Sequence, residues 1–356
     1  MLSIFSDRAY LPAGASHHIL FFPFWGKHPE DPRDPNTGRF DDYAERGATV
    51  LRLTRLEDAD IAVVPADWSS YPGDKRARGR VRELVARATH AGKEPVVFFA
   101  NDSTEPVPLP GATVLRTSVL RSARRPSEFA HPAWSEDFVE RYLGGVLPVR
   151  ERGERPVVGF CGLVASSRLR LPVRLALRRQ ERLRRDALDA LERAPGVETN
   201  FVRRDHFLGG ARRGGALDLE LLVSARREYV QNMVESDYVV CVRGAGNFSY
   251  RLYETLSCGR IPVFVDTDCV LPFDFAVDWR DHCVWVDESE IDSIAEIVAG
   301  FHERLGDAEF AELQRRCRRL WEDYLSPFGF FANLHRHFGQ PRAANPQARP
   351  ARRLAG

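Results

Sequence analysis

The stretch that decides the fold is Ser236–Trp279, SDYVVCVRGAGNFSYRLYETLSCGRIPVFVDTDCVLPFDFAVDW. Its apolar opening predicts a buried strand. The glycine turn Arg243-Gly-Ala-Gly-Asn follows, and the next residues predict a helix from about Ser249 to Cys258. Gly259 suits the position just after a helix end, and Ile261–Val265 predicts another strand. A strand, a glycine turn and a helix N-terminus form an anion site, because free N–H groups and the helix dipole face the ligand.

Side chains around this turn would complete such a site. Arg243 precedes the glycines, and Ser249 can cap the helix or donate to a phosphate. Arg251 and Glu254 are three residues apart and share one helix face. An arginine beside a phosphate supplies charge and a two-donor fork, and a glutamate one turn deeper can accept from two ribose hydroxyls. The residues alone also allow a plain surface ion pair between Arg251 and Glu254, which would stabilise little.

The rest of the chain alternates apolar runs with helical segments, which is typical of parallel strands buried in an α/β sheet. The expected strands of the first half are Ile19–Phe24, Ile61–Pro65 and Pro95–Ala100, with a helix over Val81–Ala91. The second half has further expected strands besides those in Ser236–Trp279, namely Val157–Gly162, Val197–Val202 and Cys283–Val286. A basic helical region is expected over Arg168–Arg193. Both halves of the chain are therefore expected to be α/β.

The length of 356 residues suggests two domains. The connector Gly144–Pro156, rich in glycine, proline and arginine, is the expected boundary. We predict an N-terminal domain over residues 1–150 and a C-terminal domain over residues 151–339, whose final helix can cross back to the first. Residues 340–356 hold four arginines, three prolines and no acids, so we predict a disordered basic tail.

The composition excludes some classes of protein. The 51 basic and 50 acidic side chains give a net charge of +1, whereas a dedicated nucleic-acid binder would carry a basic excess. The N-terminal residues lack a signal-peptide pattern, and no apolar run approaches the ~20 residues that span a bilayer. We expect a cytoplasmic protein, at most peripheral at the inner face of the membrane. The six cysteines form no CxxC pair and are expected to be reduced core residues.

The central stretch resembles the nucleotide-sugar-binding signature of the exostosin family, glycosyltransferase family 47. The matching elements are Arg243-Gly-Ala-Gly246, Ser249, Arg251-Leu-Tyr-Glu254-Thr-Leu256, Gly259-Arg-Ile-Pro-Val263, Leu271-Pro-Phe273 and Asp278-Trp279. Upstream, Ala59–Pro65 and Gly159-Phe-Cys-Gly162 resemble further family segments, so the likeness covers residues 15–325, more strongly in the second half. The chain departs from eukaryotic exostosins in showing no membrane anchor, and its first half is too divergent to align a catalytic base.

The resemblance implies a GT-B architecture, two Rossmann-like domains facing across a cleft, and an inverting glycosyltransferase. The donor would be a nucleotide diphosphate sugar, expected to be UDP-linked, and the acceptor a saccharide, a lipid-linked sugar or another hydroxyl compound, as in bacterial surface polysaccharide synthesis. Donor-binding roles fall to Arg168, Arg243, Gly244, Gly246, Ser249, Arg251 and Glu254, with Arg243 also stabilising the leaving group. Candidate bases are acids that end N-terminal strands, Asp102 first and Asp67 second.

Several alternatives remain at this stage. Asp266-Thr-Asp268 resembles the Asp-x-Asp that holds a metal in other glycosyltransferases, but Arg243 and the helix N-terminus already supply positive charge, so we expect no metal and no cofactor. A fucosyltransferase-like enzyme using a GDP-sugar usually has lysine after the glutamate, where this chain has Thr255. A catalytically silent GT-B-like partner protein would lack a base. His17 and His18 are expected to be structural, and the oligomeric state is left open.

Overall fold

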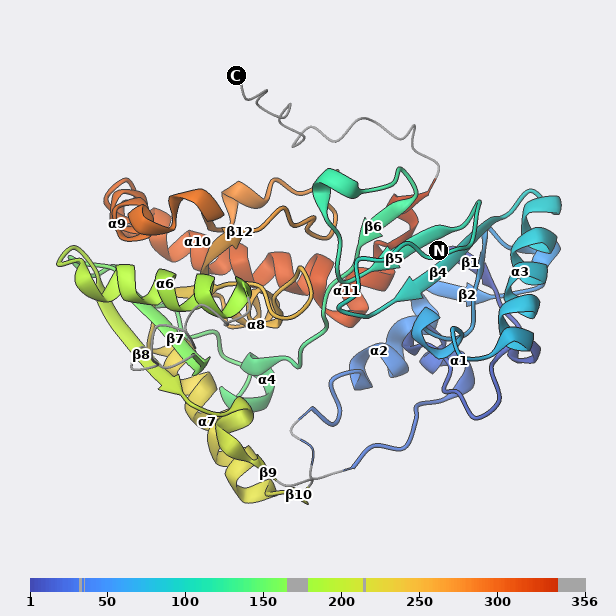
Figure 1. The fold of residues 1–356 in the computed structure, drawn as a ribbon, viewed down its shortest axis with the longest axis horizontal. Helices are drawn as coiled ribbons and strands as arrows, with labels where there is room; N and C mark the ends of the chain where they lie inside the picture. Colours follow the sequence, from blue (N-terminus) through green and yellow to red (C-terminus); the bar gives the residue numbers. More distant parts are fainter. Residues whose placement is uncertain (32–33, 35, 165–178, 214–215, 339–356) are drawn as a thin grey trace, which may run out of the picture.

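The computed structural model describes residues 1–31, 34, 36–164, 179–213 and 216–338. It contains two parallel sheets, each covered by helices, which lie side by side (Figure 1). Parallel strands buried by helices on both faces form an α/β architecture. The predicted pair of Rossmann-like α/β domains in a GT-B arrangement is therefore confirmed.

The first sheet has six strands in the order β2-β1-β3-β4-β5-β6, all parallel. They are β1 (Leu2–Phe5), β2 (Leu51–Leu53), β3 (Ile61–Val63), β4 (Glu94–Phe99), β5 (Thr113–Arg116) and β6 (Glu128–Ala130). The helices of this half are α1 (Phe22–Trp25), α2 (Asp41–Arg46), α3 (Lys75–His90) and α4 (Phe138–Tyr142). Helix α3 begins after Asp74, whose carboxylate accepts from the main-chain N–H groups of Arg76 and Ala77.

The second sheet has five parallel strands in the order β13-β12-β11-β7-β8. They are β7 (Val157–Leu163), β8 (Glu198–Arg204), β11 (Tyr238–Cys241), β12 (Ile261–Asp266) and β13 (Val284–Asp287). The helices are α6 (Arg179–Arg193), α7 (Leu219–Val234), α8 (Tyr250–Ser257), α9 (Ile294–Glu303) and α10 (Asp307–Leu320). A two-stranded hairpin, β9 (Arg212–Arg213) with β10 (Ala216–Leu217), precedes α7.

The end of the described chain connects the two halves. A π-helical turn, Trp321–Leu325, joins α10 to α11 (Pro327–Ala332). Phe330, Phe331 and Leu334 then pack into the hydrophobic cluster of the first sheet. The last helix thus returns to the N-terminal half, while the tail 340–356 lies outside the described residues.

One predicted strand is wrong. Ile19–Phe24 forms a 3-10 turn, Ile19–Phe21, followed by α1. Leu20, Phe21 and Phe22 are all buried, so the segment shows no alternation between buried and exposed positions. The sequence of such a short apolar run does not distinguish a buried strand from a buried helix. The first strand of the chain is instead β1, near the chain start, which lies next to the edge strand β2 and hydrogen-bonds to β2 and β3.

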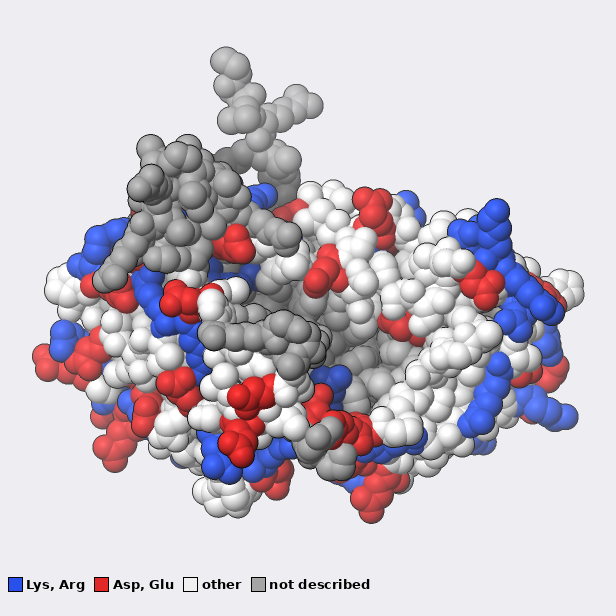
Figure 2. Space-filling model, turned by 60° about the horizontal axis from the view of Figure 1, so that its bottom comes forward, with Lys and Arg blue, Asp and Glu red and all other residues white. Residues whose placement is uncertain are grey.

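In the described residues no helix is both long and apolar enough to cross a membrane. All six cysteines are buried free thiols. Between the two halves the molecule is hollowed, as Figure 2 shows from below. The carboxyl ends of strands in open α/β sheets are where ligands bind, so the side chains at those ends define the candidate site.

Candidate active site

The glycine turn lies between the end of β11 and the start of α8, as the sequence predicts. The turn closes on itself, because the Gly244 N–H donates to the Phe248 carbonyl over 2.9 Å. Gly246 is buried and has no room for a side chain. A Cβ there would lie 2.5 Å from the Phe248 ring and 2.7 Å from Oδ1 of Asp102. The turn therefore meets Asp102, which comes from the other half of the molecule.

Three arginines surround this turn. Arg251 donates from Nη2 to the Cys161 carbonyl over 2.8 Å, and its guanidinium lies 4.1 Å from the Phe160 ring centroid. Arg184 on α6 donates to the carbonyls of Leu163 (3.0 Å) and Arg243 (3.2 Å). Main-chain carbonyls at the ends of β7 and β11 thus hold these cations in place.

Arg243, the third of these arginines, donates from Nη2 to the Ala245 carbonyl over 3.1 Å. Among the described residues, no carboxylate forms an ion pair with Arg184, Arg243 or Arg251, although the chain holds many arginine–carboxylate pairs elsewhere. The Nε atoms of all three are buried without a hydrogen-bond partner. Buried polar groups normally have partners, so this set is suited to an anion.

The electrostatics of the arginines agree with their geometry. Burial, followed by repulsion from Arg251, lowers the pKa of Arg184 to about 10. Burial and then repulsion from Arg179 lower the pKa of Arg243. Carboxylates nearby, Glu181 for Arg184 and Glu288 and Asp102 for Arg243, offset this repulsion only in part, and a bound diphosphate would relieve the remainder.

The strand β7 makes room for this arrangement with two glycines. A Cβ on Gly162 would lie 2.8 Å from Nη2 of Arg251, and one on Gly159 would lie 2.1 Å from the Ser236 hydroxyl oxygen. Both belong to the segment Gly159–Gly162 that the sequence associates with the donor domain. Gly162 thus leaves space for the guanidinium of Arg251.

The predicted ribose ligand Glu254 is mostly buried on α8, with 8% of its surface exposed. Its Oε1 accepts from Arg226 Nη1 over 3.0 Å, and its Oε2 accepts from the Tyr229 hydroxyl over 2.6 Å. Sequence reasoning missed both donors on α7. The alternative that the sequence left open, a surface ion pair between Arg251 and Glu254, does not form, because each side chain has other partners. Ser249 occupies the N-cap position of α8, where its side chain makes no capping hydrogen bond.

The two candidate bases differ in their surroundings. Asp67 is fully engaged in local structure, since Oδ1 accepts from the Ser69 N–H (2.9 Å) and hydroxyl (2.6 Å) and Oδ2 from the Ala100 N–H (2.6 Å). Asp102 is exposed, and no described group hydrogen-bonds to its carboxylate. A base must be free to accept a proton within reach of the reacting group, and of the two only Asp102 faces the glycine turn.

The Asp-x-Asp loop joins the two halves. Arg121 donates to Asp266 Oδ2 over 2.8 Å and to Oδ1 over 2.9 Å, and Asp268 accepts from the Ser122 N–H over 3.1 Å. Arg124 pairs with Asp274 over 2.6 Å nearby. The carboxylates of this loop are therefore used for contacts between the halves.

Asn247, fully buried within the glycine turn, adds to this junction. Its N–H donates to the Ser118 hydroxyl over 2.8 Å, and its Nδ2 donates to the Val119 carbonyl over 3.1 Å. Its Oδ1 accepts from the Thr267 hydroxyl over 2.7 Å. The turn is thus hydrogen-bonded to the chain that follows β5, which keeps it near Asp102. Nothing in the sequence pattern singled out this residue.

A separate cavity of about 1040 Å³ lies among α2, α4 and the π-helical turn. Several of its charged walls are already paired, with Arg318 bound to Asp137 and Glu322 over 2.7 Å each and Arg46 to Asp42 over 2.7 Å. Arg39, which also lines this cavity, lies 4.7 Å from the Phe40 ring centroid. Arg168, the remaining predicted donor ligand, lies outside the described residues.

Part of the second half of the chain is similar to known proteins. Residues 179–301 match the family described as the Exostosin GT47 domain. Exostosin-1 of Drosophila melanogaster is 33% identical over 100 residues, 28% of this chain and 12% of that protein. A probable β-1,4-xylosyltransferase of Arabidopsis thaliana is 38% identical over 63 residues, 18% of this chain and 15% of that protein. The chain therefore matches well under two thirds of either relative.

A crystal structure of a glycosyltransferase from Rickettsia africae ESF-5 overlaps with 87% of this chain and 83% of its own, at 11% identity and a TM-score of 0.39. That overlap is too loose to inform the site. The family match confirms the resemblance to the exostosin family that the sequence indicates, over residues 179–301.

Proposed function

We propose that this chain, whose residues 179–301 match the exostosin GT47 domain, transfers a sugar from a nucleotide diphosphate sugar to a hydroxyl acceptor with inversion at the anomeric carbon. The observation that carries the proposal is the set of three unpaired arginines, Arg184, Arg243 and Arg251, beside the glycine turn. Two phosphates at this turn would give those cations the partners they lack.

The proposed reaction places opposite charges on opposite sides of the cleft. The acceptor oxygen attacks the anomeric carbon and forms the new bond, while the bond from that carbon to the diphosphate oxygen breaks. Asp102 takes the proton of the acceptor hydroxyl. The nucleoside diphosphate leaves with the bonding electrons, and Arg243, supported by Arg184 and Arg251, stabilises its charge. Glu254 is assigned the ribose hydroxyls.

The proposal needs no metal ion, because the guanidinium groups supply the positive charge that the leaving group requires. Asp266 and Asp268, the residues that would hold a metal, already bind Arg121 and Ser122. UDP is the nucleotide that the family resemblance suggests. The acceptor class proposed is a saccharide or lipid-linked sugar.

The test is thermal unfolding with a panel of UDP- and GDP-linked sugars, UDP-xylose among them because one relative is named a probable xylosyltransferase. We expect one UDP-sugar to raise the melting temperature and R251Q to lose that shift. The stabilising sugar is then tested for transfer to saccharide acceptors, with the anomeric configuration of the product read by NMR. A wild-type protein that no nucleotide sugar stabilises would rule the proposal out.

A further inference from the structure

The carboxylate of Glu254 is held from one side only. Each of its two oxygens accepts one hydrogen bond, Oε1 from Arg226 and Oε2 from Tyr229. An ionised carboxylate has about four lone-pair sites. Each oxygen therefore keeps one site for a further donor, and the side chain retains a small exposed edge.

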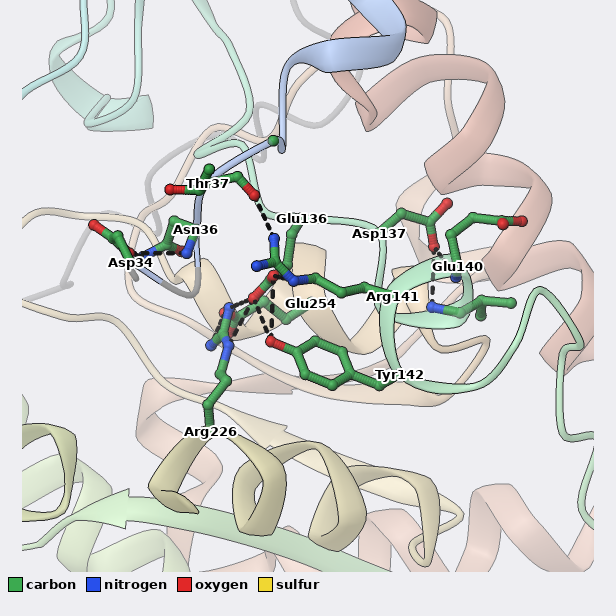
Figure 3. Close-up of polar contacts among 12 residues, drawn as sticks. Asp34, Asn36, Thr37, Glu136, Asp137, Glu140, Arg141, Tyr142, Arg226 and Glu254 are labelled. Carbon is green, nitrogen blue, oxygen red and sulfur yellow. Dashed lines mark hydrogen bonds and ion pairs between the residues drawn. The ribbon is translucent and has the colours of Figure 1, made fainter. Parts of the chain in front are cut away.

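Arg226 is itself fixed by a second carboxylate (Figure 3). Its Nε donates to Glu136 Oε1 over 2.7 Å, and its guanidinium lies 4.6 Å from the Phe138 ring centroid and 5.5 Å from that of Tyr229. Although burial alone lowers the pKa of Arg226, the carboxylates of Glu254 and Glu136 raise it above its ordinary value. The guanidinium is thus a permanent cation between two carboxylates.

Glu136 anchors this arrangement from the segment that leaves the first sheet. It is 1% exposed and also binds Arg141 over 3.1 Å and the Tyr142 hydroxyl over 3.3 Å, both from α4. Arg141 in turn donates to the Thr37 carbonyl of the loop before α2. Such anchoring removes the rotamer freedom that Arg226 would otherwise have.

Two interpretations of these contacts make opposite predictions. If Arg226 occupied the place of the ligand, it would have to leave before a ribose could bind. The contacts favour the other interpretation, because Arg226 takes a single site on one oxygen and Tyr229 a single site on the other. A vicinal diol needs two acceptor sites at a fixed spacing, and a carboxylate locked at both oxygens provides them.

We infer that Arg226 and Tyr229 are positioning residues that orient Glu254 so that its two remaining lone-pair sites accept the 2′- and 3′-hydroxyls of the donor ribose. The inference rests on the proposed function, since Glu254 is assigned the ribose there. It adds the residues that set the preference for a ribonucleotide, and it assigns Glu136 the role of holding Arg226.

The test compares binding of UDP and 2′-deoxy-UDP by isothermal titration. We expect the wild-type protein to prefer UDP about tenfold, the worth of one hydrogen bond to a charged group. R226Q should weaken UDP binding about tenfold while changing 2′-deoxy-UDP binding about twofold or less, so that the preference disappears. Y229F keeps the ring and removes one donor, and it should reduce the preference to about threefold.

The matched control is R227Q, which makes the same change at the next position of α7, where Arg227 is exposed. It should leave both affinities and their ratio unchanged. Thermal unfolding checks that each variant is folded, and if R226Q is unstable then Y229F decides. An unchanged UDP preference in a folded R226Q or Y229F, or tighter UDP binding by R226Q, overturns the inference but leaves the proposed function intact. Failure of wild-type protein to bind any nucleoside diphosphate overturns both.

Discussion

The two edges of the cleft differ in how their charges are compensated. On the edge formed by β7 and β11, Arg184, Arg243 and Arg251 are held by main-chain carbonyls and have no described carboxylate partner. On the facing edge, Asp67 accepts three hydrogen bonds, whereas no group in the described part of the chain hydrogen-bonds to the carboxylate of Asp102. One edge thus gathers cations and the other carries carboxylates. The proposed transferase, which would expel a diphosphate and take up a proton, requires this division.

The largest expected effect, on turnover, follows from removing the proposed base Asp102. Asp102→Asn removes a proton acceptor and should lower kcat about a thousandfold, within the range for general base catalysis, with the Kd for UDP unchanged. Steady-state kinetics and titration measure the two quantities.

Asp67→Asn is the matched comparison on the same sheet edge. It should lower the free energy of unfolding by about 1 kcal/mol, because the exposed main-chain N–H groups of Ser69 and Ala100 and the Ser69 hydroxyl exchange a charged acceptor for a neutral one, while the folded variant keeps most of its turnover. If Asp67→Asn abolished turnover and Asp102→Asn did not, the assignment of the base would be reversed.

The next effect concerns the leaving group. Arg243→Ala should lower kcat about a hundredfold, since removal of one group that stabilises transition-state charge has effects of that size. Circular dichroism should show a folded protein, because the side chain of Arg243 makes one hydrogen bond, to a carbonyl of its own turn. An unfolded variant would show that Arg243 is structural.

A smaller effect is expected at the junction of the halves. Asp266→Asn weakens the pairing with Arg121 and should reduce the free energy of unfolding by about 1–3 kcal/mol. Turnover of the wild-type protein should persist in EDTA, as expected if Asp266 and Asp268 serve the junction. Complete loss of turnover in EDTA, restored by Mn²⁺, would instead assign these residues to a metal.

A further effect, on stability as a function of pH, distinguishes the two halves. His131 and His337 lie in the aromatic contacts of the first sheet, and burial lowers their pKa values to about 4 and about 3. The histidines of the unfolded chain bind protons near pH 6.5, whereas those of the folded chain do so only at much lower pH. The free energy of unfolding therefore falls as the pH drops below about 6.5. The loss is about 1.4 kcal/mol per pH unit for each histidine.

Urea unfolding between pH 7.5 and 5 measures this loss, and His337→Phe should reduce its slope. If the acid sensitivity arises from the buried histidines of the first half, the amide hydrogens of β4–β6 should lose protection against exchange first at pH 5. Earlier loss of protection in β11–β13 would contradict it.

Local patterns predicted the structure of the glycine turn and its flanking strand and helix. The strand, turn and helix around Arg243 depend on neighbouring residues, and Gly259 has the positive φ of 61° expected after a helix. Arg184 was missed within the predicted basic helix, although a signal existed. It precedes the buried Leu188 by four residues and Leu191 by seven, which places it on the inward face of α6.

Long-range contacts had no such signal. Arg226 meets Glu136 across 90 positions of sequence, and Asn247 meets Ser118 across 129. The order of strands determines these meetings, and a chain of short apolar runs does not reveal that order. The wrong strand prediction for Ile19–Phe24 has the same cause. Packing against distant segments, and not the periodicity of the run itself, determines its structure.

The most direct test of the central claim is isothermal titration of UDP and of uridine into the wild-type protein and R184Q at two salt concentrations. Binding by the unpaired arginines predicts one UDP site, much weaker binding of uridine, a loss of UDP affinity at higher salt, and about tenfold weaker UDP binding by R184Q. Equal binding of UDP and uridine, or UDP binding that R184Q leaves unchanged, would contradict the claim that these cations form a diphosphate site.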